Sequence, residues 1–182
     1  MSPENEGGRT RMNPTLYIFS GLPGSGKSTL AKELARYIGA MYLRIDTIEQ
    51  AIRDLCDFNV EGEGYGLSYR VAADNLALEN SVIADSCNPI ELTRKEWRDV
   101  AVKARSNYID IEVKCSDIME HKQRLEARVE EVPGLSPPEW QDVIDREYQL
   151  WESDRIVIDT AGRSIGESFK DLILALNEHE NA

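Results

Sequence analysis

The sequence predicts an α/β protein in which a parallel sheet is covered by helices on both faces. Short apolar segments typical of strands alternate along the chain with segments of helical spacing. A glycine-rich motif joins the first of these strands to the first helix, and aspartates stand where the second and third strands end. The 182 residues, 41% of them hydrophobic, are enough for one domain with a substantial core.

The elements follow from the apolar pattern and from the residues that break it. Strands are predicted at residues 15–20, 41–45, 81–84, 108–114 and 155–158. Helices are predicted from the glycine-rich motif to Gly39 and at residues 48–56, 67–79, 92–104, 117–130, 139–151 and 165–177.

Three stretches between or before these elements are expected to be mobile. The glycine-rich stretch 61–66 is predicted to be a flexible loop, and the Pro/Gly-rich stretch 133–138 interrupts a lid of about residues 117–151. Residues 1–13 are expected to be a flexible segment that leads into a single domain at residues 14–182.

Residues 21–28 form a complete G-x-x-x-x-G-K-[ST] phosphate-binding loop between a predicted strand and a predicted helix, which is the context this motif requires. Its backbone N–H groups would surround phosphate oxygens at a helix N-terminus. We expect Lys27 to reach the β- and γ-phosphates and the Ser28 hydroxyl to bind Mg²⁺. The residues predicted to bind nucleotide are Gly21, Leu22, Pro23, Gly24, Ser25, Gly26, Lys27, Ser28, Thr29 and, from the loop after the last strand, Arg163.

Carboxylates at the strand ends supply the remaining candidates, because ligands of parallel sheets bind beyond the carboxyl ends of the strands. Asp46, Asp85 and Asp117 follow the second, third and fourth strands. Asp46 is interpreted as a general base or as the carboxylate that orients an acceptor hydroxyl, with a helix N-cap as the alternative. Asp85 is interpreted as a Mg²⁺ ligand through water, with a turn residue as the alternative.

Arginines of the predicted lid are candidates for contacting phosphates. Arg124 and Arg128 are four residues apart and share one face of the helix 117–130. Closure of the lid would bring both guanidinium groups onto the nucleotide and exclude water, whereas a solvated helix face paired with neighbouring glutamates is the alternative. Arg53, beyond Asp46, would bind an anionic group of the acceptor or remain at the surface.

Composition restricts the partners and the compartment. The net charge of −12 argues against a broad nucleic-acid surface and leaves room for a small acceptor. No apolar stretch approaches the ~20 residues of a membrane span, and residues 1–13 lack a signal-peptide core. A cytoplasmic protein is therefore expected, with reduced, mostly packed cysteines at positions 56, 87 and 115.

Other residues with a possible chemical role are assigned to structure. His121 and His179 have no catalytic or metal-binding neighbourhood in sequence and are expected at the surface. Trp97, Trp140 and Trp151 fall on amphipathic helices, where packing is expected rather than stacking on bases.

Several segments together resemble the small P-loop kinases. This group includes gluconate, shikimate and adenylylsulfate kinases, chloramphenicol phosphotransferase and the kinase domain of polynucleotide kinases. The sequence is most similar to short bacterial AAA-type ATP-binding proteins described as predicted kinases. The similar segments are residues 21–28, 43–48, 84–89, 115–117 with Arg124 and Arg128, 133–135, Trp140, Tyr148, Trp151 and 158–162, so that the resemblance covers roughly residues 15–175.

The resemblance implies a three-layer P-loop NTPase fold with a five-stranded parallel sheet of order 2-3-1-4-5 and a small helical lid. It also implies lid arginines at Arg124 and Arg128 and an acceptor-side aspartate at Asp46. Several relatives carry an arginine three residues after that aspartate, whereas this chain has Glu49 there and its next arginine is Arg53.

The resulting hypothesis is an ATP- and Mg²⁺-dependent phosphotransferase that acts on a hydroxyl group of an unidentified small molecule. Its expected catalytic residues are Lys27, Asp46, Arg124 and Arg128, and its expected metal ligands are Ser28 and Asp85. Two alternatives remain: a polynucleotide 5′-hydroxyl or RNA-repair-type kinase, and a nucleotide-binding ATPase switch. The sequence identifies neither the acceptor nor the oligomeric state, and the preference for ATP over GTP rests on the resemblance.

Overall fold

A five-stranded parallel sheet forms the centre of the protein. The computed structural model describes residues 13–56 and 58–180, so the predicted flexible segment lies, apart from residue 13, outside the described residues. The strand order is β2-β3-β1-β4-β5, which confirms the predicted order. The strands are β1 (Thr15–Ser20), β2 (Met41–Arg44), β3 (Val82–Asp85), β4 (Asn107–Lys114) and β5 (Ile156–Asp159).

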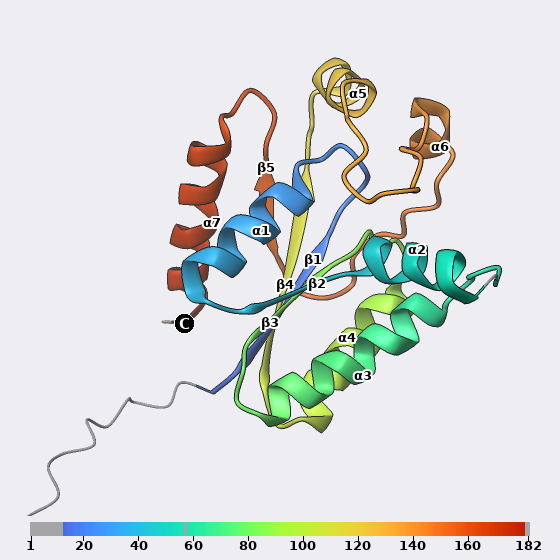
Figure 1. Ribbon diagram of the computed structural model, residues 1–182. Coiled ribbons are helices and arrows are strands. Elements are labelled where there is room, and N and C mark those ends of the chain that lie inside the picture. The colour runs from blue at the N-terminus through green and yellow to red at the C-terminus, as the bar shows by residue number, and fades with distance from the viewer. Residues whose placement is uncertain (1–12, 57, 181–182) are drawn as a thin grey trace, which may run out of the picture.

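Helices cover both faces of this sheet and make the predicted three layers (Figure 1). They are α1 (Lys27–Ile38), α2 (Ile45–Cys56), α3 (Glu63–Ala77), α4 (Glu91–Lys103), α5 (Ile118–Glu126), α6 (Trp140–Ile144) and α7 (Ile165–Glu180). None of the helices in the described part of the chain is long and apolar enough to cross a membrane.

The protein has two hydrophobic cores, one on each face of the sheet. All residues of β1 are buried, and successive side chains of this strand point into opposite cores. Tyr17 and Phe19 pack with α1 and α7 on one face of the sheet. Leu16 and Ile18 pack with α3 and α4 on the other face, around the fully buried Trp97. The central strand is thus held on both sides, and the loop that follows it starts from a rigid position.

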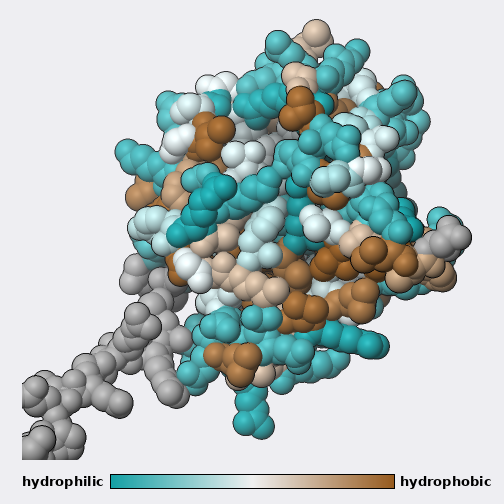
Figure 2. All heavy atoms as spheres, in the orientation of Figure 1, coloured by the Kyte–Doolittle hydropathy of each residue, from teal (hydrophilic) through white to brown (hydrophobic). Residues whose placement is uncertain are grey.

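The molecular surface is mostly hydrophilic in the view of Figure 2, with apolar side chains gathered over α2 and α3. Exposed apolar residues on or beside these two helices include Leu55, Phe58, Leu67 and Val71.

The prediction of a flexible loop at residues 61–66 is wrong for residues 63–66, because α3 begins at Glu63. The Glu63 carboxylate accepts hydrogen bonds from the N–H groups of Glu61 and Gly62, at 2.9 and 3.1 Å, and so satisfies donors at the helix start. A Cβ on Gly64 would lie 2.2 Å from Cγ of Glu49 on α2. Gly64 therefore allows α2 and α3 to pack closely.

The two lid helices are shorter than predicted. The first ends at Glu126, and the second covers only Trp140–Ile144 instead of residues 139–151. The Gln149 N–H donates to the carbonyl oxygen of Pro89 at 2.8 Å, so residues 149–150 run as a strap against the loop after β3. That pairing replaces the helical hydrogen bonds that the apolar spacing predicted.

Candidate active site

The phosphate-binding loop joins β1 to α1 and is held in place by contacts with several other segments of the chain. The Gly21 N–H donates to the carbonyl oxygen of Cys87 at 3.1 Å, and the Thr160 hydroxyl donates to that of Ser25 at 2.9 Å. Gly21 has a φ of +145°, and a Cβ there would lie 2.2 Å from the carbonyl oxygen of Val113. Only glycine fits this position, because the loop backbone crosses β4 at contact distance.

Lys27, the motif lysine, forms a buried ion pair with Asp85 at the end of β3. The other Asp85 oxygen accepts a hydrogen bond from the Tyr42 hydroxyl at 2.5 Å. Burial raises the pKa of Asp85, but the charge of Lys27 and the hydrogen bonds from Lys27, Tyr42 and Ser28 outweigh it and hold the pKa below its usual value. Burial and the nearby carboxylate raise the pKa of Tyr42, so its hydroxyl remains a donor.

The same residues fit a Mg²⁺ ion bound mainly through a nucleotide. Ser28 Oγ lies 3.3 Å from Lys27 Nζ and contacts the ionised Asp85. Two side chains with oxygen atoms that could bind a metal ion therefore lie together at the start of α1. No group of three or more histidine, cysteine, aspartate or glutamate residues suited to a metal occurs among the described residues. Mg²⁺ in nucleotide sites typically takes one or two protein ligands and completes its shell with phosphate and water.

Asp46 lies in the first turn of α2, because β2 ends at Arg44 and the helix begins at once. Its carboxylate lies 3.5 Å from Arg44 Nε, and the side chain is 44% exposed. The other end of the Arg44 guanidinium contacts Glu131 of the lid at 3.1 Å. Arg44 thus connects the candidate base to the lid, a role that the sequence did not reveal.

Glu131 brings several cations of the site together. It accepts a hydrogen bond from Lys32 at 2.6 Å and lies 3.8 Å from Arg128 as well as 3.1 Å from Arg44. The hydrogen bond from Lys32 and the nearby cations hold the pKa of Glu131 below its usual value, although partial burial opposes them. An ionised carboxylate therefore stands beside the predicted lid arginine.

Arg124 is fixed against the loop after β5. Its guanidinium donates to the hydroxyl and the carbonyl oxygen of Thr160, at 2.7 and 2.9 Å, and pairs with Glu120 at 2.5 Å. Because Thr160 in turn donates to Ser25 of the phosphate loop, α5 is linked to that loop through one threonine. The pair with Glu120 matches the alternative of a helix face paired with neighbouring glutamates, whereas the hydrogen bonds to Thr160 are not part of that alternative.

Beyond Asp46 on α2, Glu49 and Arg53 pair at 3.5 Å. Burial raises the pKa of Glu49, although Arg53 opposes this effect. The Glu49 side chain packs against Gly64 of α3, and both Glu49 and Arg53 line the cavity described below.

Many of these groups line one cavity of about 580 Å³, whereas Ser25 and Asp85, both predicted site residues, are not part of its wall. Of the residues predicted to bind or react, the cavity wall includes Gly21, Leu22, Pro23, Gly24, Gly26, Lys27, Ser28, Thr29, Asp46, Arg53, Arg124, Arg128 and Arg163. Arg44, Glu131 and Arg146 also line the cavity, and no sequence motif marked them. Arg163 additionally pairs with Asp171 on α7.

Some predicted residues have other roles. Asp117 caps α5, because its carboxylate accepts the N–H groups of Met119 and Glu120 at 2.9 and 3.0 Å, and it does not join Asp46 and Asp85. The surface position predicted for His121 is wrong: the residue is 8% exposed and contacts Pro23. His179 is exposed as predicted.

The cysteine and tryptophan predictions are confirmed in part. All three cysteines are free thiols, but Cys56 is exposed, Cys87 is half-buried and only Cys115 is buried. Trp97 is fully buried in the core, as predicted, whereas Trp151 is half-buried.

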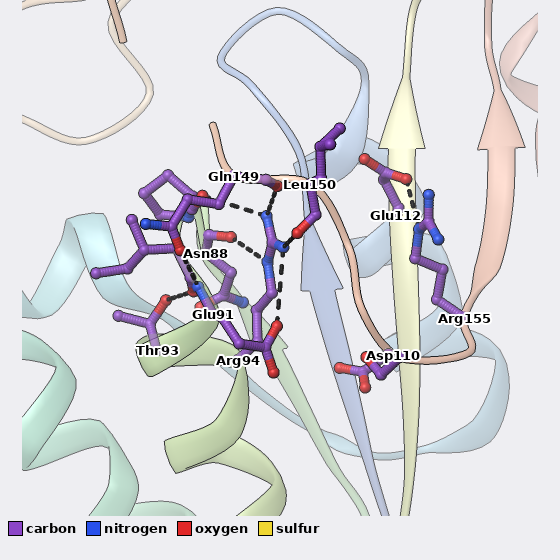
Figure 3. Close-up of polar contacts among 12 residues, drawn as sticks. Asn88, Glu91, Thr93, Arg94, Asp110, Glu112, Gln149, Leu150 and Arg155 are labelled. Atoms are coloured by element: carbon purple, nitrogen blue, oxygen red, sulfur yellow. Dashed lines mark hydrogen bonds and ion pairs between the residues drawn. The ribbon is translucent and has the colours of Figure 1, made fainter. Parts of the chain in front are cut away.

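Arg94 on α4 holds the strap after the lid in place (Figure 3). It is fully buried and donates to the carbonyl oxygens of residues 88, 89, 149 and 150, at 2.9, 3.2, 3.0 and 3.3 Å. The Arg94 guanidinium carbon lies 4.0 Å from the centre of the Trp151 ring. One side chain thereby joins the carboxyl end of β3, beside the cavity, to the segment by which the lid returns to the sheet.

The fold and this site define an α/β protein of the P-loop kinase type, with the loop at the carboxyl edge of a parallel sheet of order 2-3-1-4-5. The chain belongs to the AAA domain family, whose model matches residues 16–141. The resemblance to P-loop kinases inferred from the sequence is confirmed at this level.

Solved structures with the same fold include proteins named as kinases. One is the APS kinase CysC of Mycobacterium tuberculosis in complex with AMPPNP and APS (20% identity, TM-score 0.68, 91% of this chain and 98% of that chain). Another is a gluconokinase from Sinorhizobium meliloti 1021 (17% identity, TM-score 0.63, 94% and 99%). The structure of Kti12 of Chaetomium thermophilum in complex with ADP-AlF3, which is not named as a kinase, also has this fold (21% identity, TM-score 0.63, 88% and 98%). At these identities the similarity demonstrates a shared fold.

Proposed function

We propose that this protein is an ATP- and Mg²⁺-dependent phosphotransferase that acts on a hydroxyl group of a small molecule. The observation that carries the proposal is that the phosphate-binding loop, Asp46 and the lid arginines Arg124 and Arg128 line one cavity. A triphosphate bound to the loop would place its terminal phosphate between cations and a carboxylate. Phosphoryl transfer requires this arrangement, because the protein contributes mainly position and charge.

Each residue has a defined task in this scheme. Lys27, now paired with Asp85, would contact the phosphates, and Arg124 and Arg128 would stabilise the charge that spreads over the transferring group. Asp46, held by Arg44, would accept or orient the proton of the attacking hydroxyl. Ser28 and Asp85 would hold Mg²⁺, which neutralises phosphate charge when bound.

The known relatives by fold support a kinase and leave the acceptor open. The APS kinase structure contains APS and a gluconokinase shares the fold, so the fold accommodates chemically different acceptors. The net charge of −12 favours a small acceptor over a long nucleic acid. We also propose that the protein is cytoplasmic.

The test measures ADP release from ATP in the presence of sugars, nucleosides, antibiotics and 5′-hydroxyl oligonucleotides. With the acceptor that stimulates release, Asp46→Asn is expected to lower the rate about 10²- to 10⁴-fold, as for loss of a general base. ATP affinity, measured by calorimetry, should change less than about 2-fold. Asp54→Asn is the matched control, because Asp54 is an exposed carboxylate of the same helix that hydrogen-bonds Gln50.

The outcomes separate the alternatives. Stimulation by oligonucleotides alone would favour the polynucleotide kinase. Tight ATP binding without stimulation by any acceptor would favour the ATPase switch. Unchanged turnover of Asp46→Asn would remove Asp46 from the mechanism.

A further inference from the structure

His121 contacts the phosphate-binding loop from α5. Its Nε2 lies 2.8 Å from the carbonyl oxygen of Pro23, and the residue is 8% exposed. A carbonyl oxygen only accepts hydrogen bonds, so Nε2 must carry the hydrogen. The ring is therefore a donor, and it holds the loop at the carbonyl group of Pro23.

This hydrogen bond determines where the next N–H group points. The Pro23 carbonyl and the Gly24 N–H belong to one peptide unit, and no cis peptide occurs among the described residues. In a planar trans peptide these two groups point in opposite directions. Holding the Pro23 oxygen on α5 thus directs the Gly24 N–H away from α5.

The Gly24 N–H has no hydrogen-bond acceptor within residues 13–56 and 58–180. Unpaired N–H groups in a loop of this motif bind phosphate oxygens. Gly24 itself lines the cavity. The orientation that His121 imposes therefore matches what a bound phosphate would need.

The histidine ring is in turn fixed by close packing. A Cβ on Gly24, whose φ is +85°, would lie 3.1 Å from Cδ2 of His121 and 3.2 Å from Cβ of Leu125. On α6, the Trp140 ring meets the imidazole edge to face, with centroids 5.3 Å apart and planes at 81°. The ring thus lies between the loop backbone and the second lid helix.

We propose that His121 is a positioning residue for the phosphate-binding loop: it holds the Pro23 carbonyl so that the Gly24 N–H is presented to phosphate, and Trp140 holds the ring. The inference rests on the nucleotide binding proposed above. It adds a residue of α5 that lies outside the phosphate-binding motif and outside the group of cavity arginines.

The test is calorimetric titration of Mg²⁺ and AMPPNP into three variants. His121→Phe keeps an aromatic ring against Trp140 and removes the donor, and is expected to weaken binding about 10-fold, as for loss of one buried hydrogen bond. His121→Gln keeps an N–H donor of similar reach without the ring, and its binding is expected to stay within about 3-fold of wild type. His179→Phe, at an exposed position of α7, is the matched control and should bind as wild type does.

Thermal unfolding of each ligand-free variant accompanies the titrations. Normal binding by His121→Phe, or weakened binding by His121→Gln alone, would overturn the inference, because ring packing would then be the relevant feature. If His121→Phe does not fold, His121→Asn replaces it: its shorter side chain should weaken binding, and unchanged binding would overturn the inference. Wild-type protein that binds no AMPPNP would instead overturn the proposed function on which the inference rests.

Discussion

Replacing Arg94 by methionine removes the side chain that holds the strap after the lid. Methionine has a similar length and fills the space, but it donates no hydrogen bond. The carbonyl oxygens of residues 88–89 and 149–150 then lose their donors, and the Trp151 ring loses the guanidinium 4.0 Å from its centre. We expect a large loss of stability, because Arg94 is fully buried.

The magnitude follows from opposing contributions. A hydrogen bond from a charged donor contributes about 1.5–3 kcal/mol, so four of them set an upper limit of about 6–12 kcal/mol. Burial of the guanidinium costs several kcal/mol, which methionine does not incur. The expected net loss for Arg94→Met is therefore about 3–5 kcal/mol, in the range found when one partner of a buried charged pair is removed.

The assay is urea unfolding followed by far-ultraviolet circular dichroism, because tryptophan fluorescence would respond directly to the loss of the contact with Trp151. Arg36→Met is the matched control: Arg36 is an exposed arginine of α1 with one ion pair to Glu33, and should change stability by less than about 0.5 kcal/mol. A loss below about 1 kcal/mol for Arg94→Met would refute the reasoning, because the four hydrogen bonds would then have little net effect.

Three further predictions concern the loop and two buried carboxylates. Gly21→Ala should lower the free energy of unfolding by about 2–4 kcal/mol, because the new Cβ would meet β4 backbone. Lys27→Met should cost about 3 kcal/mol at pH 7 by leaving the buried Asp85 without its cation, and Lys27→Met with Asp85→Asn should recover most of the loss. Burial, opposed by Arg98, raises the pKa of Asp110 to about 6. The stability that the protonated carboxyl contributes is therefore present below pH 3.8 and is lost as the pH rises through 6, by up to about 3 kcal/mol. The variant Asp110→Asn should not show this loss.

Urea unfolding tests all three predictions, and wild type and Asp110→Asn are compared from pH 4 to pH 7. For Gly21, the control is Gly66→Ala on α3, where nothing lies within 4 Å of the added Cβ. Equal stability of the two glycine variants would contradict the first prediction. A double variant no more stable than Lys27→Met would contradict the second, and a stability difference between wild type and Asp110→Asn that does not change with pH would contradict the third.

Local patterns were sufficient to predict the sheet and the position of the phosphate-binding loop. The strands β1 and β3 are buried on both faces, so their sequences are short and largely apolar and are easily recognised as strands. Ligands bind beyond the carboxyl ends of parallel strands, and this rule identified Asp46 and Asp85 as candidates. In the structure Asp46 lines the cavity and Asp85 pairs with Lys27. The same rule failed for Asp117, which instead satisfies the N–H groups of its own helix.

The features that were not predicted depend on contacts between distant residues. His121 contacts a carbonyl 98 positions away, and nothing near it in sequence marks that contact. Periodicity predicted a helix through residue 151, but Arg94, 55 positions before residue 149, binds the carbonyl groups of that segment. The loop predicted from its glycines became helix because α2 packs against Gly64, and tertiary packing outweighs the low helix propensity of glycine.

The hydrogen bond between Thr160 and Ser25 has a consequence for how the protein is made. These residues are 135 positions apart, and Thr160 follows the last strand. The ribosome must therefore release the chain through residue 160 before the phosphate-binding loop can acquire this support. Contacts of such long sequence separation slow folding, because the chain loses much entropy before they form. A nascent chain that ends before β5 would contain the entire motif and still lack one of the contacts that hold it in shape.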